Sequence, residues 1–119
     1  MAQKINLADE HDGLPGPWSP ATVAAVNDHD VKVVKLEGEF LWHKHTNEDE
    51  LFLVTKGRLT MQLRDGDVDL GPGELIVVPR GVEHCPRADE GTEVLLIERL
   101  GTVNTGDAGG PLTAPEVDL

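Results

Sequence analysis

The chain is poor in aromatic residues and in basic residues. Tyrosine is absent, aromatic residues make up 3% of the sequence, and 10 Lys and Arg stand against 22 Asp and Glu, for a formal net charge of −12. Nucleic-acid binding needs cations that neutralise phosphates and rings that stack on bases, so this composition argues against it. An anionic membrane surface would repel the same charge. We therefore expect neither a nucleic-acid partner nor a membrane partner.

Long apolar runs and paired cysteines are also missing. No stretch approaches the roughly 20 apolar residues of a membrane-spanning helix, and the first ten residues lack the apolar core of a signal peptide. Cys85 is the single cysteine, so an internal disulfide is excluded, as is typical of proteins in a reducing compartment. These features predict a cytoplasmic protein in which Cys85 is a packed small side chain rather than a nucleophile.

Gly and Pro punctuate short apolar runs along the chain. With 119 residues, 13 Gly, 8 Pro and no sustained helical period, the pattern favours one all-β barrel or sandwich. We expect an N-terminal arm and edge strand over residues 1–30, the barrel over 31–100, and a tail over 101–119 that lies on the surface or across a partner. Lys56-Gly57 and Asp65-Gly66 are expected to be hairpin turns. The expected strands cover residues 31–37, 39–45, 50–56, 58–64, 68–70, 74–78, 84–88 and 92–100.

Two histidines and a glutamate lie close together in the sequence. His43 and His45 are two residues apart, so on a strand they project from the same face. The polar break at residues 46–49 resets the alternation, so that Glu50 opens the next strand. His84 follows a glycine-proline-glycine pattern further along and supplies a fourth donor. Three imidazoles and a carboxylate suit Fe, Mn, Ni, Cu or Zn, which predicts one divalent transition-metal ion per chain.

An ordinary explanation competes with the metal site. Phe40 and Trp42 would then be the buried face of a plain strand, with the imidazoles on its wet side. Glu48 and Asp49 are expected to be solvated turn residues, and His11 and His29 are expected to be exposed on the surface.

These residues stand in two motifs that resemble those of the cupin superfamily. The first reads G-x4-H-x-H-x4-E-x6-G from Gly38 to Gly57, one residue shorter at its start than the family pattern. The second reads G-x5-P-x-G-x2-H from Gly73 to His84, and Ala88 stands where the family has an asparagine. The resemblance covers residues 31–100 and implies a double-stranded β-helix, or jelly roll, with the metal at His43, His45, Glu50 and His84. Within the superfamily the chain is most similar to small single-domain cupins of the mannose-6-phosphate-isomerase-like type.

Three functions are compatible with such a site. The first is an enzyme in which the metal acts on a small organic substrate, by isomerase, lyase or dioxygenase chemistry, with Glu50 as a candidate proton carrier. The second is a metal-dependent binder of a small molecule, and the third is a barrel that the metal merely stabilises. The pocket is expected to be mostly apolar, lined by Leu41, Phe52, Val54, Met61 and Leu63.

Several expected strands are apolar on both faces, for example residues 51–54 and 94–97. A barrel wall of this kind needs a second cover. The second layer of strands, the N-terminal segment or a second copy of the chain could supply it, and we expect a homodimer.

Overall fold

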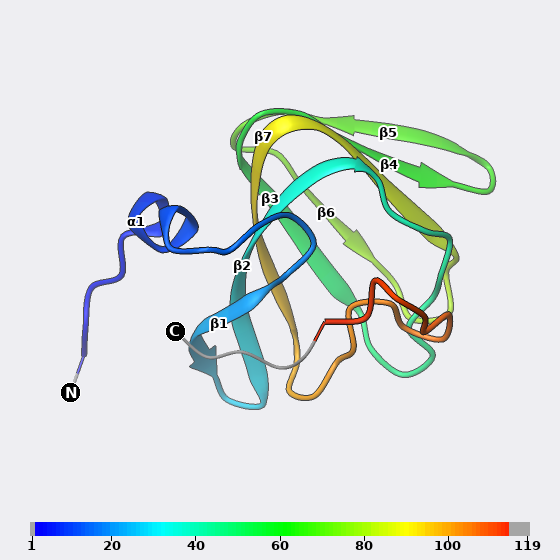
Figure 1. The fold of residues 1–119 in the computed structure, drawn as a ribbon. Coiled ribbons are helices and arrows are strands. Elements are labelled where there is room, and N and C mark those ends of the chain that lie inside the picture. Colours follow the sequence, from blue (N-terminus) through cyan, green and yellow to red (C-terminus); the bar gives the residue numbers. More distant parts are fainter. Residues whose placement is uncertain (1, 115–119) are drawn as a thin grey trace.

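Figure 1 shows the fold as a computed structural model that describes residues 2–114. A short helix, α1 (Leu7–Asp12), precedes strands that pair in the antiparallel sense throughout. The strands are β1 (Ala21–Val26), β2 (His29–Glu39), β3 (Glu50–Lys56), β4 (Leu59–Leu63), β5 (Gly66–Leu70), β6 (Leu75–Val78) and β7 (His84–Arg99). The prediction of an all-β architecture is confirmed.

The strands wrap around one interior because β7 belongs to two layers. Five strands form a path in the order β1-β2-β7-β3-β6. The first part of β7 pairs with β4, its later part pairs with β3, and β2 runs along most of its other edge. Strands β4 and β5 form a hairpin, and β7 bends over the top of the barrel in Figure 1 to reach it. The barrel interior lies between the hairpin layer and the larger sheet.

The strand predicted over residues 39–45 is wrong. Strand β2 continues to Glu39, and the chain then makes only an isolated bridge between His43 and His84 before β3 begins. The backbone of Lys44 bonds to the C-terminal segment instead of a strand, since its N–H donates to the Asp107 carboxylate and its carbonyl accepts from Asp107 N. Residues 40–45 thus form an extended loop that contacts His84 and the C-terminal segment around Asp107.

Two further expectations are corrected. The strands predicted over residues 84–88 and 92–100 are one continuous strand, β7, in which Gly91 takes a φ of 82° at the bend. Lys56-Gly57 does not close a hairpin, because β4 pairs with β5 and β7 rather than with β3. Gly57 instead passes close to β7, where a Cβ would lie 2.7 Å from Thr92 Cα. The hairpin expected between β4 and β5 does form, but its turn residues are Arg64 and Asp65 rather than Asp65 and Gly66, because Gly66 is the first residue of β5.

Helix α1 was not expected, because a helix of only six residues shows no helical period in the sequence. Asn6 caps it by accepting a hydrogen bond from Asp9 N at 3.1 Å. His11 was expected to be exposed, but its side chain is fully buried where α1 meets the sheet. Its Nδ1 lies 2.8 Å from Leu7 O and its Nε2 lies 3.0 Å from Val94 O. Among residues 2–114 no helix is both long and apolar enough to cross a membrane.

The interior is filled by the alternate side chains of the strands, as the period of two requires. A second, smaller cluster lies under α1 and β1 and includes Leu14, Ala21 and Val33. The main cluster consists of Val34, Leu36, Phe52, Val54, Leu59, Met61, Leu70, Val78, Ala88, Val94 and Leu96.

The opposite face of β6 is apolar and open. Leu75 and Val77 are 56% and 48% exposed. In register, Leu75 lies beside the half-buried Leu53 on β3, so the apolar row continues onto the next strand. The homodimer expected from such strands stays a prediction.

Candidate metal centre

Two loops bring the candidate ligands together. His43 and His84 exchange both backbone hydrogen bonds, at 3.0 and 2.8 Å, which sets the two loops side by side. His45 is fixed in the same way, since its carbonyl accepts from Gly81 N at 2.8 Å. Glu50 is the first residue of β3, as the polar break at residues 46–49 predicted. Backbone hydrogen bonds from the second motif therefore hold the two histidines of the first motif in place.

All four predicted side chains converge at one point inside the barrel. One donor atom from each of His43, His45, Glu50 and His84 lies within 4.8 Å of every other. Each residue is at most 4% exposed. Oε1 of Glu50 lies 3.2 Å from Nε2 of His45 and 3.5 Å from Nε2 of His84. A group of this composition could hold a metal ion.

Backbone carbonyls orient two of the rings. Nδ1 of His43 lies 2.9 Å from Leu41 O, and Nδ1 of His84 lies 2.9 Å from Val82 O. A carbonyl only accepts, so Nδ1 carries the proton in both rings and Nε2 presents a lone pair to the centre. Metal-binding histidines are commonly fixed in this way.

The donor atoms are also left without other partners. Nε2 of His45 and Nε2 of His84 are buried and have no hydrogen-bond partner among residues 2–114, because their contacts with Glu50 lack hydrogen-bond geometry. Buried polar atoms without partners are costly. A cation between them would satisfy both nitrogen atoms and the carboxylate, so these residues fit a divalent transition-metal ion.

Comparison with known proteins agrees with this geometry. Residues 30–98 match the family model of the cupin domain, which is more than half of the chain. The chain belongs to the cupin family. It is 33% identical over 99 residues to the uncharacterized protein YdbB of Bacillus subtilis (strain 168), an alignment that covers 82% of this chain and 88% of YdbB.

Solved structures show the same fold. A cupin-2 domain containing protein from Shewanella frigidimarina has 43% sequence identity and a TM-score of 0.77, with 80% of this chain and 93% of that chain covered. Protein NMB1881 from Neisseria meningitidis has 30% identity and a TM-score of 0.73, covering 82% and 99%. The narrower expectation of a mannose-6-phosphate-isomerase-like cupin stays a prediction.

Electrostatics inside this cupin favour a neutral imidazole at His43 and an ionised carboxylate at Glu50. Burial, with the charge of His84, lowers the pKa of His43 to about 4, so this ring is neutral at pH 7. Burial alone would lower the pKa of His45 as well, but the Glu50 carboxylate outweighs it and raises that pKa. Burial would also raise the pKa of Glu50, yet its neighbours Glu98, His45 and His84 together hold it well below its usual value.

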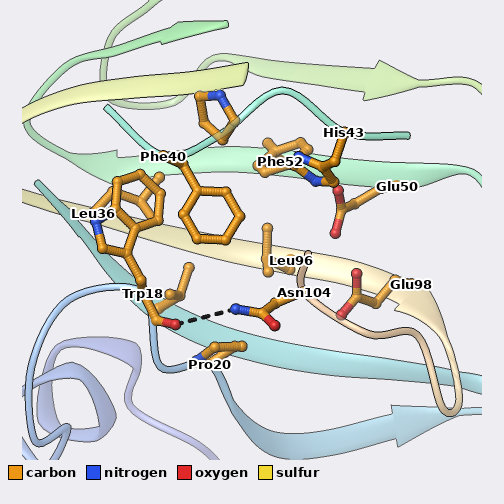
Figure 2. A pocket seen from close by; sticks show the side chains of 12 residues that line it. Trp18, Pro20, Leu36, Phe40, His43, Glu50, Phe52, Leu96, Glu98 and Asn104 are labelled. Atoms are coloured by element: carbon orange, nitrogen blue, oxygen red, sulfur yellow. Dashed lines mark hydrogen bonds between the residues drawn. The ribbon is translucent and has the colours of Figure 1, made fainter. Parts of the chain in front are cut away.

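A cavity of about 40 Å³ adjoins two of the four candidate ligands, His43 and Glu50. Figure 2 shows His43 and Glu50 at one end of it and Trp18 stacked on Phe40 at the other, with ring centroids 4.6 Å apart. Its apolar lining comes from Trp18, Pro20, Val34, Leu36, Phe40, Phe52, Pro86 and Leu96, and its polar lining from His43, Glu50, Glu98 and Asn104.

The lining differs from the sequence-based prediction. Of the five residues expected there, only Phe52 faces the cavity, while Val54 and Met61 belong to the core beneath it. Leu41 lies on the loop that replaces the predicted strand, which moves Phe40 to the cavity.

Glu98 is a functional candidate that the sequence analysis missed. It lies on β7 directly opposite Glu50 on β3 and is 1% exposed. Burial and the nearby Glu50 raise its pKa, while Lys32, whose Nζ lies 3.1 Å from Oε1, opposes the shift. The signal was available in principle, because Glu98 has the same parity as the inward-facing Val94 and Leu96.

The C-terminal segment also forms part of the site. Gly106 packs so closely on the first loop that a Cβ there would collide with Lys44 O and lie 3.1 Å from Cδ2 of His43. Asn104 reaches the cavity and donates to Trp18 O at 3.4 Å, the contact dashed in Figure 2. Residues 104–107 thus lie against the chain's own barrel, and the end of the predicted tail, 115–119, is outside the described residues.

Proposed function

We propose that this cupin binds one divalent transition-metal ion through His43, His45, Glu50 and His84, and that a small organic molecule binds or reacts at that ion. The observation that carries the proposal is the convergence of four buried donor atoms, two of them without any other partner. The cavity beside them gives a ligand access to the same point.

The metal ion would supply Lewis-acid chemistry, or redox chemistry if it is iron or copper. The residues of this chain have separate tasks. The carbonyls of Leu41 and Val82 hold two imidazoles with Nε2 toward the ion. The apolar wall keeps water away from the reacting group, which strengthens electrostatic interactions there. Glu50, the buried carboxylate next to the cavity, is the candidate proton carrier.

In the first form of the proposal the protein is an enzyme with isomerase, lyase or dioxygenase chemistry, and the cavity holds its substrate. A non-catalytic binder would use the same residues without turnover. A purely structural metal is less consistent with an open cavity beside the donors, because structural sites are normally closed by protein ligands.

Metal content tests the proposal directly. The chelated protein is reconstituted with Fe, Mn, Ni, Cu or Zn in turn, and bound metal is measured by elemental analysis. We expect about one ion per chain for at least one metal and a loss of it in His45→Ala. His29→Ala, at a half-exposed histidine outside the site, is the matched control and should retain the metal. Substoichiometric binding of every metal by the wild type would refute the proposal.

Thermal unfolding separates a functional from a structural metal. For a functional site, His45→Ala should melt close to the metal-free wild type and lose every metal-dependent ligand shift, with only a small stability cost. For a structural site, removal of the metal by chelator and the His45→Ala change should both lower the melting temperature strongly and to a similar extent. The second result, together with the absence of metal-dependent ligand shifts, would favour the structural reading.

A further inference from the structure

A second cavity borders the candidate metal centre at His45. It lies between the loop of residues 44–48 and the C-terminal segment of residues 101–107, which are side by side in Figure 1. It shares no lining residue with the cavity beside His43 and Glu50. Its volume is about 220 Å³, above the roughly 150 Å³ of a cavity that holds benzene, so it has room for a small organic molecule.

His45 is the candidate ligand whose second ring nitrogen has no partner in the protein. Nδ1 of His43 and Nδ1 of His84 each donate to a backbone carbonyl at 2.9 Å. His45 is 4% exposed and lines the second cavity, yet its Nδ1 makes no hydrogen bond with any of residues 2–114. With a metal ion at Nε2, Nδ1 carries the proton, and metal-binding histidines usually donate it to a carboxylate, a carbonyl or a water. A ligand in the second cavity can supply this missing acceptor.

The second cavity carries charges of both signs. Glu48, Asp107 and Lys44 all line it. Burial lowers the pKa of His45, whereas the carboxylates of Glu50, Glu48 and Asp107 raise it, so the last two act on the ring electrostatically. Oδ1 of Asp107 accepts a hydrogen bond from Lys44 N at 2.9 Å, which leaves Oδ2 for a ligand. The cavity thus offers the N–H donor of His45 together with two carboxylates and one ammonium group.

These groups select the chemistry of the ligand. A ligand carboxylate can accept from Nδ1 of His45, but on its own it would be repelled by Glu48 and Asp107. A ligand ammonium can pair with those two carboxylates, but it offers no acceptor to His45. A neutral polyol would bond to the same groups without charge assistance, and such hydrogen bonds are weaker. A molecule that carries both a carboxylate and an ammonium group satisfies all three side chains and adds no net charge.

We propose that the second cavity binds a small zwitterionic α-amino acid, whose carboxylate accepts from Nδ1 of His45 and whose ammonium group pairs with Glu48 and Asp107. Alanine has as many non-hydrogen atoms as benzene, so an amino acid of this size fits the volume. The bound carboxylate fixes the His45 ring as the carbonyls of Leu41 and Val82 fix the other two rings. This ligand does not touch the metal ion, so the inference goes beyond the proposed function and rests on it only for the ion at Nε2 of His45.

The test compares probes that carry both charged groups, one of them or neither. Isotope-labelled, zinc-loaded protein is titrated with L-alanine, propanoate, isopropylamine and glycerol, and the dissociation constants are measured from NMR amide shifts. One ion pair in a partly exposed cavity corresponds to about a fivefold change in dissociation constant. We therefore expect each of the other three probes to bind about fivefold or more weakly than L-alanine. Absence of L-alanine binding, or an equal affinity for any of the other probes, would overturn the proposal.

The same spectra locate the bound amino acid. The backbone amide signals of Thr46, Gly101 and Gly106, which line the second cavity, should shift as L-alanine is added. Shifts confined to the surroundings of the smaller cavity, for example at Leu36 and Phe52, would place the ligand there and would contradict the assignment of the second cavity.

A charge variant tests the contact with the ammonium group. Glu48→Gln keeps the size of a half-exposed side chain and removes its charge, so L-alanine should bind about fivefold more weakly while propanoate should not bind more weakly. Glu90→Gln changes the net charge equally at an exposed glutamate outside the cavity, and should leave both affinities unchanged. An unchanged affinity of Glu48→Gln for L-alanine, or an equal loss in Glu90→Gln, would show that Glu48 does not hold the ligand and would overturn the proposal.

Zinc content is measured before each titration and separates the two proposals. Protein that takes up neither zinc nor any other transition metal contradicts the proposed metal centre and this inference with it. Protein that is loaded with zinc but does not bind L-alanine contradicts only the assignment of the second cavity.

Discussion

Acidification should lower the free energy of unfolding of the metal-free protein, because His43 is buried as a neutral imidazole. The pKa of this imidazole is about 4 in the folded chain, because of burial and the charge of His84, against an ordinary value of 6.5. Between these values the unfolded chain binds a proton that the folded chain does not, so stability rises with pH in this window and falls as the pH drops from 6.5 toward 4. At pH 5, about 1.5 units below the pKa of the unfolded imidazole, protonation of His43 stabilises the unfolded chain relative to the folded chain by about 2 kcal/mol.

The contribution of His43 is measured as a difference between the wild type and a variant that lacks this imidazole. Urea unfolding of chelated wild type and His43→Gln at pH 7 and pH 5 gives the free energy that wild type gains over the variant. That advantage should shrink by about 2 kcal/mol between the two pH values. An advantage of the wild type over His43→Gln that is the same at both pH values would refute the argument that burial keeps this ring neutral.

Three further changes have expected outcomes. Gly106→Ala should lower the free energy of unfolding in urea by about 2 kcal/mol or more and weaken metal binding, because a Cβ at this position collides with the first loop. Gly109→Ala is the control: Gly109 has a similar positive φ, but its Cβ would meet open space, so the loss should be about 1 kcal/mol. Leu75→Lys on the open face of β6 should convert the expected dimer to a monomer in sedimentation, whereas Val26→Lys, also at an exposed position, should not; identical sedimentation of Leu75→Lys and wild type would contradict this interface. Cys85, whose pKa burial raises to about 11, should react with a thiol reagent about a hundredfold more slowly in the folded than in the unfolded protein at pH 8, and similar rates in the two states would count against its burial.

The sequence carried enough information to predict the convergence of the four candidate ligands, because the determinants of that convergence are local. The two-residue spacing of His43 and His45 and the polar break before Glu50 act over a few residues, and backbone geometry alone translates them into convergence. The convergence is observed even though residues 40–45 form a loop and not a strand, since the bridge to His84 keeps this segment extended. The local spacing was therefore a better guide than the secondary structure inferred from it.

The cavity beyond the metal centre was harder to predict because its parts come from distant segments. Trp18 and Asn104 meet across 86 positions of sequence, through a side-chain amide and a backbone carbonyl that no periodicity reveals. His11 was misjudged for the same reason, since its burial depends on the carbonyl of Val94, 83 residues away. Glu98 differs from these residues, because its inward parity among apolar neighbours was visible in the sequence.

The C-terminal segment shows why a scarcity of apolar residues is a poor guide to the role of a segment. Few hydrophobic side chains occur after residue 100, and the segment was expected to lie on a surface or across a partner for that reason. Its attachment uses other chemistry: Asp107 bonds to both backbone groups of Lys44, and Gly106 allows the close approach because it has no side chain. Lys44 stands between His43 and His45, so the segment fixes the backbone from which two proposed metal ligands project. Backbone hydrogen bonds and a glycine contact of this kind stabilise the site without contributing to any hydrophobic pattern, and only a three-dimensional structure reveals them.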